Sequence, residues 1–498
     1  MIRFGTGGWR AIIGEEFTKQ NVQLLTQAVA NIMIEQNCTT NGFVIGYDRR
    51  FLSDKAAKWM SEVLAGNGIQ VFFIEKVAPT PLVMFTVNRL DAYYGAAVTA
   101  SHNPADYNGI KVFSRGGRDA SEEVTANIEK YIENIQNSIN SGINSGINSC
   151  DSTNVNCSYQ NSGTVGGIKT VDFCSGIEKG IIKTIDPFNA YIDTIINMID
   201  MEAIKGRNLK ILLDPMFGVS KTSLQTILIT ARCEVDIIND RHDTLFGGRL
   251  PSPSSHTLQR LRDMVVEKGY DLGIGTDGDA DRLGIIDEKG NFIHPNSILA
   301  LLYYYLLKYK KWNGGVVRNV ATTHLLDRIA QGFGETCHEV PVGFKHISSN
   351  MEKYDCLIGG ESSGGLTIRG HINGKDGIFA ASLLIELLSV TGKSLSQLLG
   401  EIHKDFGGSY MTEKDFKFSH AEKDRLMKLL FDEKKLPAFN YEVEKVSYMD
   451  GVKVYFRNGG WVITRFSGTE PLLRIFCEME KEEMASEVSN AMKEFLKL

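Results

Sequence analysis

The sequence lacks the features that mark several common classes of protein. Its eight cysteines are scattered and form no Cys-x-x-Cys pair, so no zinc-ligand spacing is present and free thiols are expected. Basic side chains are not in excess, because 54 lysines and arginines stand against 60 aspartates and glutamates, a net charge of −6. A nucleic-acid partner bound through bulk positive charge is therefore not expected.

Long apolar runs are also missing. The longest, residues 298–307, is too short to cross a bilayer and is followed by lysines, so a buried helix is expected there. The first ten residues contain no apolar core of a signal peptide. The P-loop pattern G-x-x-x-x-G-K-[ST] does not occur either. We therefore expect a cytoplasmic protein with no membrane partner.

What the sequence does contain is a repeated alternation of short apolar strands and amphipathic helices. Near-continuous apolar strands separated by helices are typical of parallel sheets covered on both faces. Strands are indicated at 42–48, 69–75, 94–100, 209–215, 234–238, 271–275, 314–320 and 355–360. The pattern predicts an α/β protein with three successive α/β domains of mixed, mainly parallel sheets, over residues 1–190, 191–288 and 289–405.

The last ninety or so residues change character. Strands are indicated at 441–446, 452–457, 461–466 and 472–477 with little between them, and Asn-Gly-Gly at 458–460 marks a hairpin turn. A terminal helix is expected from Lys481. Residues 406–498 are therefore predicted to form an α+β domain with an antiparallel sheet.

One segment fits neither pattern. Residues 137–162 hold seven asparagines and seven serines in INSG-type repeats, with almost no charge. Such low-complexity composition predicts a flexible surface insertion in the first domain, to which no functional role is assigned.

Ser101 and His102 lie in the segment TASHNP (99–104), directly after a predicted strand. This places them at the carboxyl end of a strand, where open α/β sheets bind ligands. A serine there is either a nucleophile or a turn-capping hydroxyl, and the bare pattern favours the cap. No G-x-S-x-G elbow surrounds it, so a hydrolase triad is not supported.

Three aspartates, Asp277, Asp279 and Asp281, alternate in the segment GTDGDADRLG (275–284). Alternation along an extended loop points the three carboxylates the same way, and unpaired negative charges crowded together are costly. A hard divalent cation resolves this, and oxygen-only ligands suit Mg²⁺. An EF-hand is rejected, because its sixth position is Arg282 where a glycine is needed. An exposed acidic turn without a metal is the remaining alternative.

Further polar segments carry residue types that bind phosphate or sugar hydroxyls. In RFSGTEPLLR (465–474), two arginines bracket two hydroxyls and a glycine, a set that suits a phosphate dianion. GGESSGG (359–365) places a carboxylate and a hydroxyl between glycine pairs, where they could bind sugar hydroxyls. Each segment alone also fits a plain turn. Arg10 in FGTGGWR and Lys345 in VGFKHI are weaker signals of the same kind.

In this order, TASHNP, GTDGDADR, GESSGG and RFSGTEP resemble the signatures of the α-D-phosphohexomutase superfamily, which includes phosphoglucomutases and phosphomannomutases. The resemblance covers nearly the whole chain. It implies three related α/β domains and a fourth domain hinged on them, around a central cleft. It also implies small-molecule sugar phosphates as partners and a monomer or homodimer.

The resemblance further implies a role for each matching residue. Ser101 is the expected phosphoserine, and the expected metal ligands are Ser101, Asp277, Asp279 and Asp281. The expected catalytic basic groups are Arg10, His102, Lys111 and Lys345, with His102 and Lys111 as candidates for proton transfer. The expected substrate-binding residues are Arg249, Arg282, Glu361, Ser363, Arg465, Ser467, Gly468, Thr469 and Arg474.

The implied reaction moves a phosphoryl group between carbon 1 and carbon 6 of a hexose. The cofactors are Mg²⁺ and a hexose 1,6-bisphosphate, which is both activator and intermediate. GESSGG lacks a histidine found in many phosphomannomutases and phosphoglucosamine mutases, which favours glucose phosphate, and Gly7 replaces a common serine with little expected effect. The alternatives are a phosphomannomutase or phosphoglucosamine mutase and, in other classes, a phosphoserine-dependent phosphatase or a non-catalytic sugar-phosphate sensor.

Overall fold

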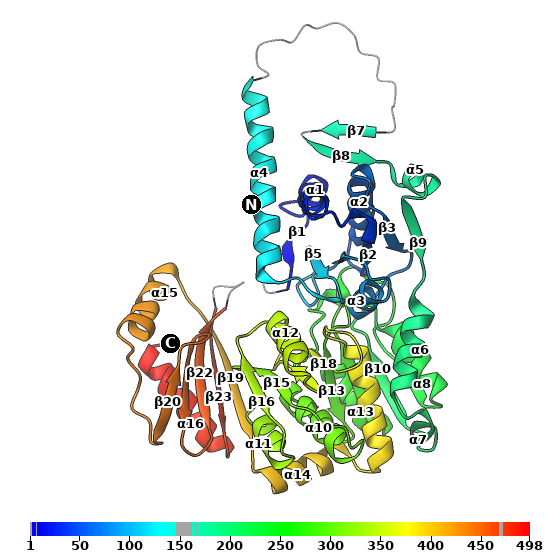
Figure 1. The fold of residues 1–498 in the computed structure, drawn as a ribbon. Coiled ribbons are helices and arrows are strands. Elements are labelled where there is room, and N and C mark those ends of the chain that lie inside the picture. Colours follow the sequence, from blue (N-terminus) through cyan, green and yellow to red (C-terminus); the bar gives the residue numbers. More distant parts are fainter. Residues whose placement is uncertain (1, 6, 146–161, 166, 468–471) are drawn as a thin grey trace, which may run out of the picture. The chain divides into compact units, whose positions relative to one another are not determined.

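The computed structural model describes residues 2–5, 7–145, 162–165, 167–467 and 472–498. Contacts between residues divide the chain into two compact units, each built from two ranges. The first unit comprises Met1–Gly290 and Ile372–Ser382, and the second comprises Asn291–His371 and Leu383–Leu498. Figure 1 labels their helices and strands.

The first sheet of the first unit is mixed, in the order β1-β5-β4-β2-β3-β9. Strands β2, β3, β4 and β9 run parallel, and β5 is antiparallel to both β1 and β4. The short strand β6 pairs with β5. The bounds are β1 Trp9–Ile12, β2 Phe43–Tyr47, β3 Val71–Ile74, β4 Tyr94–Val98, β5 Tyr107–Ser114, β6 Arg118–Asp119 and β9 Ile182–Ile185.

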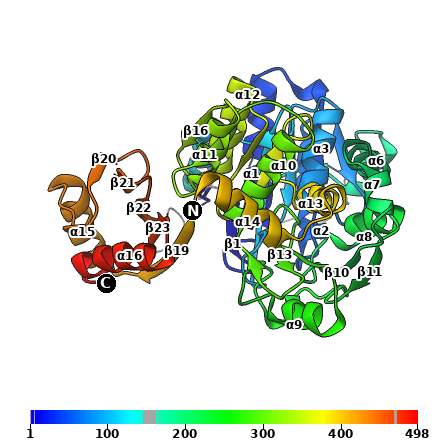
Figure 2. The ribbon, with the colours of Figure 1, turned by 90° about the horizontal axis from the view of Figure 1, so that it is seen from below.

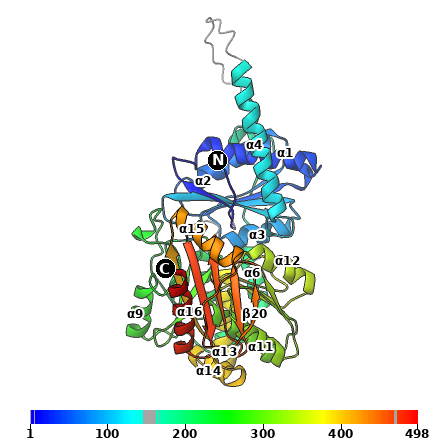
Figure 3. The ribbon, with the colours of Figure 1, turned by 90° about the vertical axis from the view of Figure 1, so that its left-hand side faces the viewer.

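Helices cover both faces of this sheet. Figure 3 shows α1 (Lys19–Glu35) and α2 (Ser53–Gly66) on one face and α3 (Thr80–Arg89) on the other. The side chain of Thr18 caps α1 by accepting a hydrogen bond from the backbone N–H of Asn21. The buried apolar side chains of α1 and α2 form one continuous core with those of the sheet.

The polar insertion begins inside a long helix. Helix α4 extends over Glu122–Ser145, so residues 137–145 are helical, which differs from the flexible segment expected from composition alone. Two apolar residues of its earlier turns, Ile128 and Ile132, are buried in the core, and this packing anchors the helix that the polar residues continue. Residues 146–161 of the insertion lie outside the described residues. After them come the hairpin β7 (Ser162–Val165) and β8 (Ile168–Val171) and helix α5 (Phe173–Glu178).

The second sheet of the first unit has β10 and β12 at its centre. Strand β10 pairs in parallel with β11 and β12, and β12 pairs antiparallel with β13. Figure 2 shows α6 and α8 side by side in this region. The bounds are α6 Phe188–Met198, α7 Met201–Lys205, β10 Lys210–Asp214, α8 Lys221–Thr230, β11 Glu234–Ile237, η2 Phe246–Gly248, α9 Gln259–Lys268, β12 Leu272–Thr276 and β13 Leu283–Asp287. The short β12–β13 connection carries the three predicted metal ligands.

The second unit begins with a smaller mixed sheet in the order β16-β15-β17-β18. Strand β15 runs parallel to β16 and β17, and β18 is antiparallel to β17. The apolar run 298–307 lies in α10 and is buried, as the sequence predicts. The bounds are β14 Phe292–Ile293, α10 Pro295–Lys308, β15 Val316–Asn319, α11 Leu325–Gly332, β16 Cys337–Val340, α12 Phe344–Tyr354, β17 Ile358–Gly360, β18 Leu366–Ile368, α13 Gly377–Thr391 and α14 Leu395–Phe406.

Among the described residues, no single helix is long and apolar enough to cross a membrane. Helices α13 and α14 pass a length and composition test only when taken together, and they are bent by 81° at the break between them.

The C-terminal sheet is antiparallel throughout, in the order β19-β23-β22-β21-β20. Helix α16 packs on β19 and β23 and covers one face of the sheet (Figure 3). The bounds are β19 Tyr410–Lys417, α15 His420–Met427, η3 Lys428–Asp432, β20 Val443–Ser447, β21 Val452–Phe456, β22 Trp461–Phe466, β23 Leu472–Met479 and α16 Glu482–Leu496. The predicted fold class, mixed and mainly parallel sheets followed by an antiparallel one, is confirmed.

Candidate functional site

Ser101 sits in the turn that follows β4, at the carboxyl end of that strand. It is 1% exposed and has a left-handed backbone conformation, with φ of 53°. Its backbone N–H donates to Thr99 Oγ1 at 2.8 Å, which holds the turn. Its hydroxyl donates to Asp277 Oδ2, also at 2.8 Å. The serine hydroxyl is therefore within a side chain's reach of the aspartates.

The carboxylates of Asp277, Asp279 and Asp281 lie together. One oxygen from each falls within 4.8 Å of the others, and all three residues are buried. Burial, followed by the charges of Asp279 and Asp281, raises the pKa of Asp277 well above its usual range. The carboxylate charges are therefore crowded together in a site with little water.

The three carboxylates fit a divalent cation. Asp279 Oδ1 and Asp281 Oδ1 are buried and, among the described residues, have no hydrogen-bond partner. Buried carboxylate oxygens without partners are uncommon in folded proteins, and a bound ion is one common reason for them. Oxygen ligands of this kind suit a hard cation. These residues could therefore hold a metal ion beside Ser101.

Two lysine ammonium groups balance part of the negative charge. Lys111, on β5, donates to Asp279 Oδ2 and to Asp281 Oδ2, each at 2.6 Å. Burial lowers the pKa of Lys111, but these two carboxylates outweigh burial and raise it above its usual range. Lys375 Nζ lies 3.2 Å from Asp281 Oδ2. Lys111 is therefore held in its protonated form, as a fixed positive charge next to the serine loop.

Arg10, His102 and Arg282 lie around the same loop. Arg10, on β1, donates to Asn103 Oδ1 at 2.7 Å. The backbone N–H of Arg282 donates to Asp277 Oδ1 at 3.1 Å, and its guanidinium contacts His102 Nδ1. Burial, then Arg282 and Arg10, lower the pKa of His102 well below its usual range. The imidazole is therefore held in its neutral form, and the same burial and guanidinium charges oppose its protonation.

Arg249 is exposed directly after η2. The neighbouring Pro251 accepts a hydrogen bond from the backbone N–H of Gly278 at 3.2 Å. The segment that carries Arg249 therefore lies beside the aspartate loop.

The predicted sugar-binding residues lie in the second unit. Glu361, in the turn after β17, is 8% exposed. Its Oε1 accepts from Asn319 Nδ2 and from the backbone N–H of Gly343, both at 3.1 Å. Ser363 Oγ lies 3.5 Å from the other oxygen, Oε2. Glu361 is thus fixed through one oxygen. Lys345 lies in the first turn of α12, a helix that begins directly after Gly343.

The predicted phosphate clamp lies in the C-terminal sheet. Arg465 on β22 and Arg474 on β23 are directly opposite each other. Each arginine already lies beside a carboxylate, because Arg465 Nε is 3.0 Å from Asp450 and Arg474 Nε is 3.7 Å from Asp415, and two guanidinium groups on one face suit an anion such as phosphate. The backbone N–H of Ser467 donates to the carbonyl of Leu472 at 2.8 Å. Gly468 and Thr469 lie outside the described residues.

Asp450 is a residue of this region that the sequence analysis missed. Its Oδ1 accepts from Arg465 Nε at 3.0 Å, and its Oδ2 accepts from the backbone N–H of Val342 at 2.9 Å. It therefore links the clamp arginine to the loop that precedes Lys345.

Lys375 and Thr80 were also missed. Thr80 Oγ1 donates to Asp279 Oδ2 at 2.6 Å. A signal existed for Lys375, because glycines flank it in NGKDG (373–377), as they flank the other polar segments. Thr80 lies in an ordinary helix start and carries no such signal.

Four family models match the chain in order. They describe the α/β/α domains I, II and III and the C-terminal domain of phosphoglucomutase/phosphomannomutase, over residues 1–138, 189–290, 294–406 and 426–494. A phosphoglucomutase/phosphomannomutase of Thermococcus kodakarensis is 30% identical over 97% of this chain and 96% of its own. A phosphoglucosamine/phosphogalactosamine mutase of Sulfurisphaera tokodaii is 27% identical over 99% and 98%. A solved structure from Thermus thermophilus, described as a phosphomannomutase, is 28% identical with a TM-score of 0.81, over 100% and 99% of the two chains.

Proposed function

This chain belongs to the phosphoglucomutase/phosphomannomutase (α-D-phosphohexomutase) superfamily, and on that premise we propose that it moves a phosphoryl group between carbon 1 and carbon 6 of a hexose through a phosphoserine at Ser101. The observation that carries the proposal is the 2.8 Å hydrogen bond between Ser101 Oγ and Asp277 in the buried aspartate cluster. A nucleophilic oxygen beside a candidate metal site is what phosphoryl transfer requires.

The aspartates Asp277, Asp279 and Asp281 would hold Mg²⁺, together with an oxygen of the phosphorylated Ser101. When bound, Mg²⁺ supplies a positive charge that neutralises the transferring phosphoryl group. Lys111 supports the same charge as a fixed ammonium, and Arg10 approaches it from β1.

The reaction consists of two phosphoryl transfers in opposite directions, first from Ser101 to the sugar and then from the sugar to Ser101. In the first, the bond between Ser101 Oγ and phosphorus breaks as a sugar hydroxyl oxygen bonds to phosphorus, and the hydroxyl proton passes to a base. The product is a hexose 1,6-bisphosphate, which reorients in the site. In the second, its other phosphoryl group returns to Ser101 Oγ, and the same base gives its proton to the sugar oxygen left behind. His102, whose Nδ1 lies 3.4 Å from Ser101 Oγ, and Lys111 are the two side chains proposed for this exchange.

The clamp and the sugar loop favour a mutase over a phosphatase or a sensor. A mutase must hold the phosphate that is not reacting, whichever carbon bears it, and the facing arginines Arg465 and Arg474 provide a site of that charge. A phosphatase needs no second phosphate site. A sensor needs neither a nucleophile nor buried carboxylates without partners.

Glucose 1-phosphate and glucose 6-phosphate are the proposed substrates, because GESSGG lacks the histidine noted above. The similar relatives include both a phosphoglucomutase/phosphomannomutase and a phosphoglucosamine/phosphogalactosamine mutase. We place the enzyme in the cytoplasm as a monomer or homodimer, with sugar phosphates as its only substrates.

A coupled assay tests the reaction. Glucose 1-phosphate is supplied with and without Mg²⁺ and glucose 1,6-bisphosphate, and formation of glucose 6-phosphate is followed. We expect turnover that needs Mg²⁺ and is stimulated by the bisphosphate. Release of free phosphate at the rate of substrate loss would instead identify a phosphatase. A faster rate with mannose or glucosamine 1-phosphate would overturn the choice of sugar.

Ser101→Ala tests the nucleophile. The variant is expected to lose turnover while sugar-phosphate affinity is largely kept, because the alanine removes only the oxygen that carries the phosphoryl group. Ser114→Ala, at the end of β5, is the matched control and should turn over normally. Normal turnover by Ser101→Ala would refute the mechanism.

A further inference from the structure

The loop that carries Ser101 is held from beneath by a buried arginine. The side chain of Arg50 has no exposed surface. Its Nη2 donates to the carbonyls of Ser101 at 2.8 Å and Asn103 at 2.6 Å. Its Nη1 donates to the carbonyls of Pro104 at 2.7 Å and Tyr107 at 3.0 Å. One guanidinium therefore satisfies four backbone carbonyls of a single turn.

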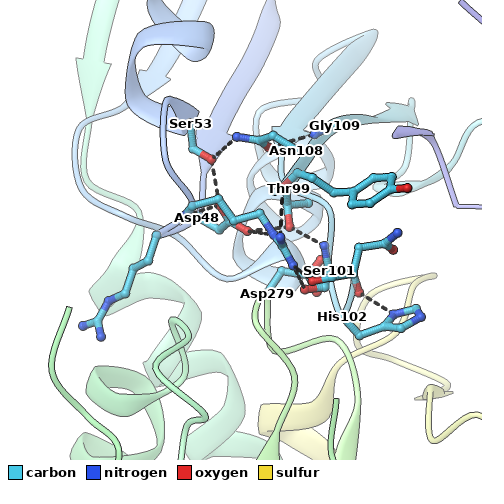
Figure 4. A network of polar contacts seen from close by, with 12 residues as sticks. Asp48, Ser53, Thr99, Ser101, His102, Asn108, Gly109 and Asp279 are labelled. Atoms are coloured by element: carbon cyan, nitrogen blue, oxygen red, sulfur yellow. Dashed lines mark hydrogen bonds and ion pairs between the residues drawn. The ribbon is translucent and has the colours of Figure 1, made fainter. Parts of the chain in front are cut away.

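A second chain of hydrogen bonds reaches the same serine from the neighbouring strand end. Asp48 Oδ2 accepts from Thr99 Oγ1 at 2.7 Å, and Thr99 Oγ1 accepts from the backbone N–H of Ser101 at 2.8 Å. Asp48 Oδ1 accepts from Ser53 Oγ at 2.8 Å, and Ser53 in turn accepts from Asn108 Nδ2. Figure 4 shows these residues converging on Ser101. The carboxylate of Asp48 also lies 3.6 Å from Arg50 Nε.

The local backbone explains why such support is needed. Ser101 is a non-glycine residue with φ of 53°, a conformation that costs free energy and persists only where the surroundings impose it. Donors that point at the carbonyls of residues 101, 103, 104 and 107 impose it. Without them, the turn could relax and move Ser101 Oγ away from Asp277.

We propose that Arg50 is a positioning residue for phosphoryl transfer, which holds Ser101 Oγ in one place whether or not it carries a phosphoryl group. The inference rests on the proposed function, because it concerns the same serine. Arg50 is enclosed, so it cannot touch the sugar or the transferring phosphoryl group, and it acts only through the loop. A serine that must give and receive a phosphoryl group in each turnover needs a turn that does not change shape between the two steps.

The neighbouring arginine provides a matched comparison. Arg49 donates to the carbonyl of Asp240 at 3.1 Å and makes no hydrogen bond to the serine loop among those of the described residues. It has the same chemistry and the next position in the chain, but it does not support the turn. Its substitution therefore controls for loss of an arginine in this part of the fold.

The main experiment compares Arg50→Lys with Arg49→Lys. A single ammonium cannot serve four carbonyls in two directions as a guanidinium does. We expect kcat to fall at least 30-fold in Arg50→Lys with KM changed less than threefold, and both to stay within twofold of wild type in Arg49→Lys. Hydrogen exchange of the amides of residues 100–107, followed by mass spectrometry, should accelerate only in Arg50→Lys.

The outcomes separate the two proposals. A wild-type protein that fails to isomerise sugar phosphates would defeat the proposed function, while accelerated exchange in Arg50→Lys would still support the role of Arg50 in the loop. A folded Arg50→Lys variant with kcat within threefold of wild type, or with unchanged exchange, would overturn the inference. So would a loss confined to KM, because it would indicate altered binding rather than a displaced nucleophile.

Thr99 gives a second test that does not depend on how well Arg50→Lys folds. Thr99→Val removes the hydroxyl between Asp48 and Ser101 and keeps the shape of the side chain. We expect kcat to fall about tenfold in Thr99→Val, a loss of about 1.4 kcal/mol of transition-state stabilisation, and to recover in Thr99→Ser. Failure of the serine variant to recover would show that packing, and not the hydrogen bonds, holds the loop.

Discussion

Two clusters of charged side chains, one in each unit, differ in how well their charges are paired. In the first unit, Asp279 and Asp281 share Lys111 at 2.6 Å, Asp281 also lies 3.2 Å from Lys375, and Asp277 accepts from the hydroxyl of Ser101. Two of their oxygens are buried without a partner among the described residues. The pKa of Asp277 is raised by burial and by its neighbours.

In the second unit, the charges are paired and balanced. Arg318 donates to Asp327 at 2.6 and 2.9 Å and also contacts Glu339. Lys453 donates to Glu339 and to the carbonyl of Val320, each at 2.7 Å. Two positive and two negative side chains meet here, and within the described chain none of their nitrogens or oxygens is buried without a partner. Lys453 lies on β21 and Glu339 on β16, so the cluster joins two sheets.

The comparison teaches that burial of charge does not by itself mark a functional site. The cluster of Arg318, Asp327, Glu339 and Lys453 pairs its charges, and an unpaired buried group would cost stability. Among the described residues, single carboxylate oxygens without a partner also occur in the second unit, at Glu386 and Glu478, but the aspartate cluster groups two of them among three carboxylates that could hold one cation. The grouping of open acceptors beside the Ser101 hydroxyl, more than buried charge, points to the first unit as the place of chemistry.

The largest expected effect comes from replacing one carboxylate of the aspartate cluster. Asp277→Asn should lower turnover at least about 10³-fold, because it removes a proposed metal ligand and a partner of Ser101. Its free energy of unfolding without metal should stay equal or rise, since the repulsion among the carboxylates falls. The coupled assay and urea unfolding measure the two effects. Asp263→Asn, exposed on α9, is the control, and a clear loss of stability in Asp277→Asn would contradict the comparison.

The opposite result is expected in the paired cluster. Glu339→Gln leaves Arg318 and Lys453 without their shared carboxylate, so the free energy of unfolding should fall by about 3 kcal/mol. Turnover at a temperature where the variant is folded should stay within about threefold of wild type. A variant that kept its stability but lost activity would show that the second cluster also takes part in the reaction.

Mg²⁺ should stabilise the folded protein through the aspartate cluster and not through the cluster of Arg318, Asp327, Glu339 and Lys453. A cation that binds only the folded protein stabilises it by about 2.7 kcal/mol at a free concentration 100 times its dissociation constant. Mg²⁺ should therefore raise the unfolding midpoint of wild type and of Glu339→Gln alike, and a chelator should reverse the shift. Asp277→Asn should show little shift, and an equal shift there would place the metal elsewhere.

The smallest expected effect is a pH dependence in the paired cluster. His324 Nε2 lies 3.0 Å from Lys453 Nζ and 3.7 Å from Glu339, and its ring stacks on Tyr455. Burial, then Arg318 and Lys453, lower its pKa from 6.5 to about 3. The unfolded chain binds this proton below pH 6.5 and the folded chain does not. The contribution of His324 to the free energy of unfolding is therefore fully present above pH 6.5 and is lost as the pH falls toward 3. Over this range the free energy of unfolding falls by up to about 1.4 kcal/mol per pH unit.

Urea unfolding at pH 7 and pH 5 measures this slope in wild type and in His324→Gln. The variant should lose less stability over that interval, because glutamine does not titrate. Equal slopes in the two proteins would show that His324 is protonated in the folded state.

Much of the architecture could be predicted from local patterns. Apolar strands alternating with amphipathic helices predict the mixed sheets, and the closely spaced strands after residue 440 predict the antiparallel one. Strand β19 was missed because its alternation of exposed and half-buried residues is weak. The helical state of residues 137–145 was missed because it depends on α4 being anchored upstream, which composition does not report.

The sequence by itself determined the aspartate cluster, since carboxylates at alternate positions of one tight loop face the same way whatever surrounds them. Only the tertiary structure decided which partners these groups have. Ser101 meets Asp277 across 176 residues, and Arg50 finds the carbonyls of its loop 51 to 57 residues away. Such contacts follow from which strands become neighbours in a sheet and where their ends fall. That order is set by the packing of whole layers, and no short stretch of sequence records it.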